Sequence, residues 1–388
     1  MNQGKYVFAQ ILSFLPKRTF DGIVNKYGGN KYIRHFTCWN QLLCMLFGQL
    51  TNRESLRDLV VTLEAHHKKS YHLGIGKKVT RSNLAKANQK RDYRIFEEFA
   101  YHLIAITKVK FSDQNFDTEH QKIYAFDSST IDLCLNVFWW AKFRKAKGGI
   151  KLHTLFDVQT QIPSFVHITP ANTHDVKAMD ELVYEVGAFY VFDRGYLDFG
   201  RLFKITNCEA YFVIRAKMNM KFNRIYSAKV DKTKGVLCDQ TGKLSGFYTS
   251  KNYPDKLRRI KYYDSENKRT FVFLTNNIEA TAEDIALLYK KRWQIELFFK
   301  WMKQHLKIKS FWGISENAVR IQIYTAISTY CLVAIVAQEL KINRSTYEIL
   351  QILGISLLDK TPLNELFKNI DYNNVNELEY KQLSINLF

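Results

Sequence analysis

The sequence has few prolines and few cysteines, and neither type forms a recognisable pattern. Only five of the 388 residues are proline while 46% are hydrophobic, which predicts a globular protein rather than a disordered one. The six cysteines are scattered, with no CxxC pair and no histidines at zinc-ligand spacing. We therefore expect reduced thiols in a cytoplasmic protein, and neither a disulfide framework nor a structural zinc site.

The sequence also lacks a long apolar run free of polar residues. The run at 7–16 (VFAQILSFLP) is too short and too polar for a signal sequence. The stretch 321–340 is the most apolar of the later segments, but glutamine, threonine and serine interrupt it. We expect 321–340 to be a buried helix, and we expect no membrane partner.

The sequence has fewer acidic than basic residues. The chain has 57 Lys and Arg against 37 Asp and Glu, a formal charge of +20, which points to a polyanion such as nucleic acid or an acidic membrane surface. Residues 1–115 hold 19 basic and 8 acidic side chains, a net charge of +11. Within them a short helix that Thr80 or Ser82 can cap carries Arg81, Lys86 and Arg91, which is compatible with a helix-turn-helix reader of DNA. It is equally compatible with a solvent-exposed basic helix.

Patterning and composition divide the chain into five segments with an α/β fold at the centre. Residues 121–216 read as three strands, helix 174–186, a strand ending at Asp193, helix 199–206 and a further strand, which predicts a mixed sheet with antiparallel and helix-connected strands. The predicted segments are a helical DNA-binding domain at 1–115, the first part of a catalytic core at 116–217, a β-rich insertion at 218–269, the second part of the core at 270–345, and a helical tail at 346–388.

Two aspartates and one glutamate are the candidate catalytic residues. Asp127 lies in the apolar strand KIYAFDSSTIDL, where a buried carboxylate must be paired, hydrogen-bonded or bound to a metal. Asp193 ends the apolar strand AFYVFD, although a turn aspartate is as common there. With Glu296 they form an all-oxygen ligand set, which favours Mg²⁺ or Mn²⁺ over zinc, and two such ions can drive phosphoryl transfer. A glycosidase-like carboxylate pair is the alternative, but it would leave the basic charge unexplained.

Glu296 belongs to a stretch that predicts one long helix, residues 281–309. Thr281 supplies a capping box, and no Gly or Pro interrupts the helix. Next to its apolar stripe, Tyr289, Arg292, Glu296 and Lys303 fall on one narrow strip of surface, which suits a site for a metal ion and a phosphate backbone. The alternative is an ordinary exposed ion pair between Arg292 and Glu296.

These motifs together resemble the DDE transposases of the IS4 type, from bacterial insertion sequences. The resemblance rests on YAFDSST, VFDRGY, the stretch KGGIKLHTLFDVQTQIPSFVHITPANTHD, and the spacing Tyr289-x2-Arg292-x3-Glu296-x6-Lys303. It implies a ribonuclease-H-like core with a β-rich insertion and an N-terminal helical domain, in which Asp127, Asp193 and Glu296 are the metal ligands.

The resemblance also implies what the protein binds. Tyr289, Arg292 and Lys303 are expected to hold the DNA backbone near the cleaved end. The expected partners are the terminal inverted repeats of the element, target DNA and a second copy of the chain, all at the bacterial nucleoid.

The chain departs from some relatives in one respect. It has no tryptophan between Trp140 and Trp293 to stack a flipped base, so Phe247, Tyr248 or Tyr253 would have to serve. A structure-specific nuclease, a DNA-binding repressor and a basic RNA-binding protein are the rival interpretations.

Overall fold

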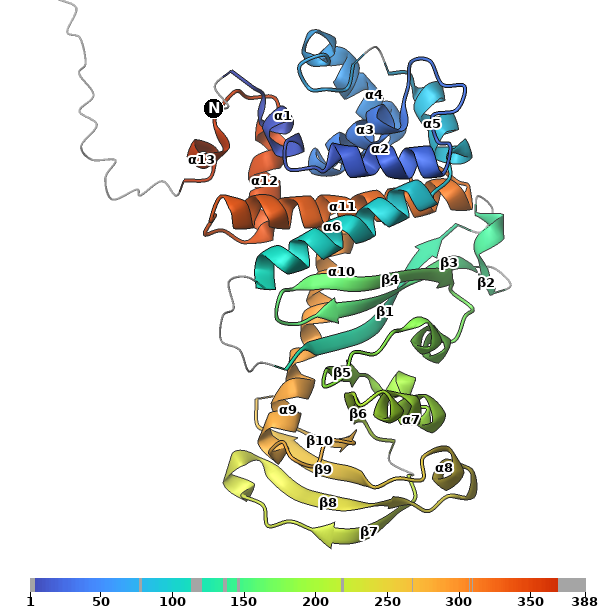
Figure 1. The fold of residues 1–388 in the computed structure, drawn as a ribbon, viewed down its shortest axis with the longest axis vertical. Coiled ribbons are helices and arrows are strands. Elements are labelled where there is room, and N and C mark those ends of the chain that lie inside the picture. Colours follow the sequence, from blue (N-terminus) through green and yellow to red (C-terminus); the bar gives the residue numbers. More distant parts are fainter. Residues whose placement is uncertain are drawn as a thin grey trace, which may run out of the picture.

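The structure is a computed structural model that describes residues 4–76, 79–112, 121–134, 138–144, 147–217, 220–266, 268–306, 308 and 310–368 (Figure 1). Its α-helices are α1 (Val7–Leu12), α2 (Lys17–Lys26), α3 (Cys38–Leu50), α4 (Leu56–Ala65), α5 (Arg81–Lys90), α6 (Arg94–Ser112), α7 (Phe199–Asn207), α8 (Phe247–Asn252), α9 (Ala282–Lys291), α10 (Trp293–His305), α11 (Glu316–Glu339), α12 (Thr346–Ser356) and α13 (Leu363–Leu366). The strands are β1 (Ile123–Leu133), β2 (Lys142–Arg144), β3 (Lys147–Asp157), β4 (Ile162–Pro170), β5 (Phe189–Phe192), β6 (Tyr211–Arg215), β7 (Phe222–Ser227), β8 (Val236–Leu244), β9 (Leu257–Asp264) and β10 (Arg269–Thr275). Its 3₁₀ helices include η3 (Asp175–Glu181) and η4 (Arg194–Tyr196).

The ten strands found in the described residues belong to one mixed sheet, and this confirms the predicted α/β class. The strand order is β2-β3-β1-β5-β6-β10-β9-β8-β7, and β4 also pairs with β3. β3 pairs antiparallel with both β1 and β4, whereas β1, β5 and β6 run parallel. The strands β7, β8 and β9, which lie within the predicted insertion, extend the sheet beyond β10. The sheet therefore runs without interruption from β2 to β7.

Side chains alternate between two covered faces of this sheet. On β1, Ile123 and Ala125 pack in a core shared with α9 and α10, whereas Tyr124 and Phe126 pack in a second core with η3 and α7. This alternation follows from the period of two in a strand. A residue at an odd position near Ala125 thus faces α9 and α10, and its neighbour faces α7.

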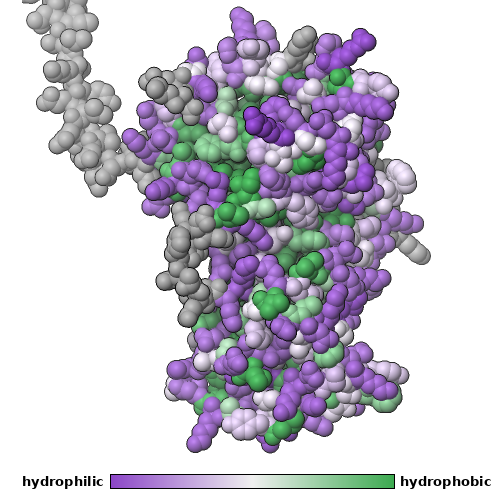
Figure 2. All heavy atoms as spheres, viewed as in Figure 1, coloured by the Kyte–Doolittle hydropathy of each residue, from purple (hydrophilic) through white to green (hydrophobic). Residues whose placement is uncertain are grey.

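The helices at the two ends of the chain gather around the apolar helix α11 and form a helical layer, which we define as α1–α6 and α11–α13. α11 packs against α3, α5, α6 and α12. It is long and apolar enough to cross a membrane, but 94% of its most apolar window is buried inside the fold. The expectation of a buried helix at 321–340 is therefore confirmed. Figure 2, which views the same side as Figure 1, shows polar side chains over most of this surface, with the apolar ones in small groups between them.

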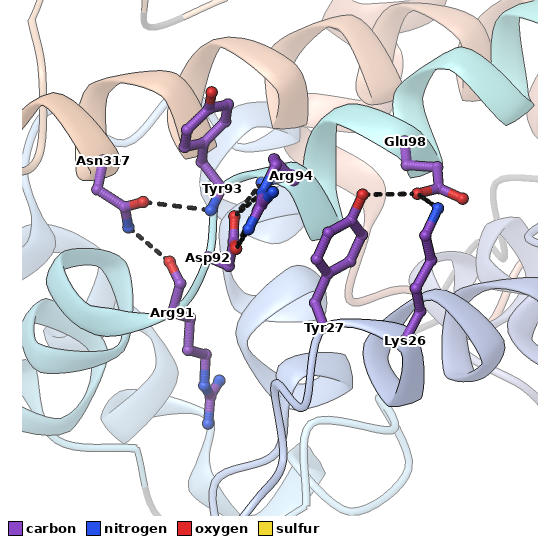
Figure 3. A network of polar contacts seen from close by, with 8 residues as sticks. All are labelled: Lys26, Tyr27, Arg91, Asp92, Tyr93, Arg94, Glu98 and Asn317. Atoms are coloured by element: carbon purple, nitrogen blue, oxygen red, sulfur yellow. Dashed lines mark hydrogen bonds and ion pairs between the residues drawn. The ribbon is translucent and has the colours of Figure 1, made fainter.

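Polar contacts connect α11 to the N-terminal helices. Asn317 at the start of α11 accepts a hydrogen bond from the backbone N–H of Tyr93 and donates to the backbone carbonyl of Arg91 (Figure 3). On α6, Glu98 accepts from Lys26 and Tyr27 at the end of α2. The helices of the predicted segment 1–115 are therefore held around α11, which lies in the predicted segment 270–345.

The helical layer also contacts the sheet directly. α6 packs on β4, where the hydroxyl of Tyr101 donates to the carbonyl of Val166 at 2.8 Å and accepts from the N–H of the same residue at 3.2 Å. At the other end of the sheet, α9 and α10 run behind the strands toward the helical layer (Figure 1). α6, α9 and α10 therefore all contribute to the core that contains Ile123 and Ala125 of β1.

Three predicted elements are wrong in detail. The single helix expected at 281–309 is two helices that meet at Arg292, where the bonds Arg292 N–H to Tyr289 C=O and Ile295 N–H to Arg292 C=O both span three residues rather than four. α10 ends at His305, and Lys307 and Lys309 lie outside the described residues. The helix expected at 174–186 is the shorter 3₁₀ helix η3, and residues 247–250 of the predicted insertion are helical rather than extended.

Candidate active site

Asp127 and Asp193 occupy matching positions on two adjacent parallel strands. β1 pairs with β5 up to Phe126 and Phe192, and each aspartate is the next residue along its chain. Because side chains alternate across a strand, Asp127 is directed to the same face as Ala125, the face that α9 and α10 cover. The strand register therefore brings the two carboxylates to one edge of the core beside these helices.

The junction of α9 and α10 supplies the other predicted side chains. Tyr289 lies in the last turn of α9, its ring 4.6 Å from the ring of Phe273 between centroids, and its hydroxyl donates to Asp193 Oδ1 at 3.3 Å. Arg292 donates from Nη1 to Asp127 Oδ2 at 3.0 Å and from Nη2 to Glu296 Oε1 at 2.5 Å. The phenol thus holds one predicted carboxylate and the guanidinium the other two, and the guanidinium carbon of Arg292 lies 5.7 Å from the centroid of the Tyr289 ring, which brings the two sets into one group.

The electrostatics of this group are dominated by burial. Burial raises the pKa of Asp127 to about 6, and the charges of Asp193 and Glu296 raise it as well, whereas the N–H of Ser128 and the guanidinium of Arg292 lower it. Burial also raises the pKa of the Tyr289 hydroxyl, which keeps it a hydrogen-bond donor at neutral pH. A carboxyl group with this raised pKa is one that a nearby cation would stabilise strongly in its ionised form.

The donor set fits a hard divalent cation, although the side chains are not gathered around one point. Asp127, Asp193 and Glu296 offer only oxygen atoms, the ligands that Mg²⁺ and Mn²⁺ prefer. Among the residues that the structure describes, no three His, Cys, Asp or Glu side chains lie close enough together to hold a metal ion. Arg292 is bonded to two of the three carboxylates instead.

A cleft of about 760 Å³ opens beside these residues. Asp193, Tyr289, Arg292 and Glu296 line it, together with side chains that the sequence analysis did not single out: Arg215, Tyr262, Asp264, Glu266, Arg269, Phe271, Phe273, Ala286, Leu287, Lys290 and Trp293. The guanidinium groups of Arg215 and Arg269 lie 5.3 Å and 5.6 Å from the ring centroid of Phe271. Arg215 lies at the end of a predicted strand, and this position is the one feature of the sequence that could have indicated a residue of the site.

Behind Asp127, a polar group on the opposite face of β1 fixes the end of the site. Ser128 Oγ donates to Asp175 Oδ1 at 2.7 Å, and Lys151 Nζ lies 3.0 Å from the same oxygen. Lys151 also donates to the carbonyl of Thr173 at 2.8 Å. These residues belong to the motif stretches that carried the family resemblance, but no role was predicted for them.

Lys303 lies farther along α10, where its Nζ donates to the backbone carbonyl of Thr130 at 2.9 Å. Thr130 is three residues beyond Asp127 on β1, so this lysine is near the site, as its position on the predicted strip suggested. No signal in the sequence marks the bond of Lys303 to the main chain.

The residues predicted to bind DNA in the helical layer have different environments. Arg81 and Lys86 are exposed on α5, which the side chain of Thr80 caps as expected. Arg91 is only 8% exposed, and its guanidinium donates to the carbonyls of Phe36 and Thr37 and to Gln41 Oε1. The prediction that Arg91 contacts DNA is corrected on this ground, because its donors are used inside the fold.

The proposed stacking residues are also corrected in part. Tyr253 is 1% exposed, and its hydroxyl lies 2.8 Å from the hydroxyl of Thr206. Phe247 and Tyr248 are exposed on α8, which packs against α7, whereas the candidate site faces α9 and α10. None of the three therefore lines the cleft beside Asp193.

Comparisons with known proteins show the family to which the chain belongs. The family model described as the transposase DDE domain matches residues 118–332, more than half of the chain, and a model described as a domain of unknown function matches residues 3–76. A protein of Sinorhizobium fredii named as a transposase, y4zB, is 36% identical over 272 residues, which are 69% of this chain and 74% of the relative. A protein of Geobacillus stearothermophilus named as the transposase of insertion sequence element IS5377 is 31% identical over 53% of this chain and 54% of its own length. A protein of Synechocystis named for the element IS4SA is 28% identical over 66% of this chain and 72% of its own length.

The chain therefore belongs to the family of DDE transposases, enzymes that catalyse phosphoryl transfer on DNA. The family resemblance predicted from the motifs is confirmed, and so is the function of a DNA transposase. The comparisons do not favour the nuclease or the repressor interpretation. Membership implies a ribonuclease-H-like fold, DNA binding and dependence on a divalent metal.

Proposed function

We propose that this transposase cuts both ends of its own element out of double-stranded DNA and joins them to a target, with Asp127, Asp193 and Glu296 as ligands of two Mg²⁺ or Mn²⁺ ions. The observation that carries the proposal is the group formed where β1 and β5 end beside α9 and α10, in which Tyr289 is bonded to Asp193 and Arg292 to Asp127 and Glu296. Such ions supply activation of a water or a 3′-hydroxyl and stabilisation of the leaving oxygen.

The side chains around the carboxylates have separate tasks in this proposal. Tyr289 orients the carboxylate of Asp193 through its hydroxyl, while its ring is held by Phe273. Arg292 and Lys303 offer positive charge to the phosphates that flank the scissile bond, where charge develops in the transition state. Such charges act more strongly in a partly buried cleft than on an open surface, and the Arg292 side chain is 15% exposed.

The proposal assigns a role to each part of the fold. The ribonuclease-H-like core consists of β1–β6 with α9 and α10. The strand order β4-β3-β1-β5-β6 supports this assignment, because β4, β3 and β1 pair antiparallel and β1, β5 and β6 pair parallel. Residues 218–269 form the β-rich insertion. The helical layer grips the terminal inverted repeats through exposed basic side chains, among them Arg81 and Lys86, in a homodimer assembled on DNA in the bacterial cytoplasm.

The test is an incubation of the full chain with labelled element ends, Mg²⁺ and a target plasmid. The proposal predicts joined products with the wild type, and neither cutting nor joining with Asp193→Asn, which keeps the shape of the side chain. Asp180→Asn is a matched control, because Asp180 is an exposed carboxylate paired with Arg201 outside the cleft. Cut ends that are never joined would show a nuclease, and binding without cutting would show a repressor.

A further inference from the structure

Arg292 is bonded to the same carboxylates that the proposed function assigns to metal ions. It donates to Asp127 Oδ2 at 3.0 Å and to Glu296 Oε1 at 2.5 Å. Its side chain is 15% exposed, against 57% for Glu296, so the guanidinium lies below the rim of the cleft rather than in open solvent. One cation of the protein itself is therefore already paired with two of the three carboxylates.

A divalent ion and this guanidinium compete for the same carboxylates. Mg²⁺ requires ligand oxygens at about 2.1 Å in near-octahedral geometry, and a second positive charge within a few ångström repels it. The other oxygen of Asp127, Oδ1, accepts from the backbone N–H of Ser128 at 2.8 Å, so both oxygens of this carboxylate are already engaged. Metal binding therefore requires Arg292 to release Asp127, Glu296 or both.

A DNA phosphate is the acceptor best suited to take the released guanidinium. The planar fork of arginine matches the two free oxygens of a phosphodiester as well as it matches a carboxylate. Nε of Arg292 is buried with no hydrogen-bond partner among the described residues, so the side chain has a donor that its present position leaves unsatisfied. In the proposed function, the backbone of a bound duplex enters the cleft that Arg292 lines.

We propose that Arg292 exchanges partners, holding Asp127 and Glu296 in the free protein and a DNA phosphate in the complex, so that DNA and divalent ions strengthen each other's binding. The inference rests on the proposed function, because it takes the three carboxylates as metal ligands. Coupling of this kind is reciprocal: DNA raises the affinity for metal by the same factor as metal raises the affinity for DNA. The free enzyme then binds metal weakly, and the site gains its full metal affinity only when a DNA backbone is bound.

The first experiment measures Mn²⁺ binding to the full chain without DNA, from the electron paramagnetic resonance signal of free Mn²⁺. Arg292→Gln, which removes the charge but keeps a polar side chain, is expected to bind Mn²⁺ about fivefold or more tightly than the wild type. Arg292→Lys, with its charge on a single nitrogen, should fall between the two.

The matched control is Arg320→Gln. Arg320 also pairs with a glutamate four residues away, Glu316, at 2.8 Å, with side chains 18% and 51% exposed and the guanidinium over an aromatic ring, but outside the cleft. Its Mn²⁺ affinity should equal that of the wild type. A thermal melt of each variant establishes that the measured chains are folded.

The second experiment adds a short DNA duplex at low salt, with the Mn²⁺ taken up by DNA alone subtracted. DNA should tighten Mn²⁺ binding to the wild type and leave Arg292→Gln nearly unchanged. If folded Arg292→Gln binds Mn²⁺ no more tightly than the wild type, the exchange is wrong. The variant Asp193→Asn distinguishes failure of the exchange from failure of the metal site. If Asp193→Asn binds Mn²⁺ as well as the wild type does, the proposed metal site is wrong and the exchange is wrong with it. If Asp193→Asn loses Mn²⁺ binding while Arg292→Gln shows no gain, only the exchange is wrong.

Discussion

Arg292 Nη1 lies 3.0 Å from Asp127 Oδ2, although the two residues are 165 positions apart in the chain. The contact joins the apolar strand that carries the first carboxylate to the helix junction that carries the last one. An exposed pair between Arg292 and Glu296 alone would stabilise the fold by at most ~1 kcal/mol. The link to Asp127 makes the arginine part of the site rather than a surface ion pair.

Replacing Arg292 or Lys303 by alanine is expected to lower the cleavage of element ends by about 100-fold or more per folded molecule, since each would remove a charge from phosphates in the transition state. The measurement is cleavage rate divided by the folded fraction from a thermal melt. Reduced stability with normal cleavage per folded Arg292→Ala molecule would show that this residue is structural.

Tyr289 separates the effect of a ring from that of a hydroxyl. Tyr289→Phe keeps the packing on Phe273 and loses one hydrogen bond of 3.3 Å to Asp193, so cleavage should fall less than about tenfold and stability by no more than ~1 kcal/mol. Tyr289→Ala should lower the free energy of unfolding by about 3 kcal/mol, because a buried ring is removed. Urea unfolding and cleavage assays on both variants check this, and equal stability of the two would contradict it.

The helical layer offers a comparison of buried and exposed basic residues. Arg91→Ala should lower the free energy of unfolding by more than about 2 kcal/mol, because the carbonyls of Phe36 and Thr37 lose their donor inside the fold. Arg81→Ala and Lys86→Ala should leave stability unchanged and weaken DNA binding, most clearly at low salt. A stable Arg91→Ala protein with selectively reduced DNA binding would restore the original prediction for Arg91.

His153 makes stability depend on pH. Burial lowers its pKa from 6.5 to about 4, so between these values the unfolded chain takes up a proton that the folded chain does not. The free energy of unfolding should therefore fall as pH drops through this range, by about 3 kcal/mol in total. Unfolding of the wild type and His153→Asn at pH 7.5 and 4.5 tests this: the advantage of the wild type should shrink at the lower pH, and an advantage that does not change with pH would contradict the assignment.

The parts of the fold that follow local patterns could be read from the sequence. The strands around Asp127 and before Asp193 were foreseen because apolar runs bounded by turns mark buried strands, and Thr80 and Thr281 do cap their helices. The motif spacing also identified the residues that Arg292 and Tyr289 join in the site. These signals depend on neighbours in sequence, and they needed no knowledge of tertiary contacts.

Features set by distant contacts could not be foreseen. Arg91 looks like a surface residue in sequence, but its donors meet carbonyls more than fifty positions away. The segment after His174 has helical spacing, yet Val183 and Val186 are exposed because the chain must turn at Gly187, with φ +74°, to enter β5. Nothing local indicated that α11 would lie at the centre of the N-terminal helices.

The central claim is that Asp193, with Asp127 and Glu296, binds the catalytic ions, and a change of metal preference tests it most directly. The variant Asp193→Cys replaces a hard oxygen ligand by a softer thiolate, which Mn²⁺ accepts better than Mg²⁺ does. Cleavage of labelled element ends should be abolished in Mg²⁺ and restored in part in Mn²⁺, while the wild type cleaves in both. Cleavage by Asp193→Cys in Mg²⁺ at the wild-type rate would contradict the account.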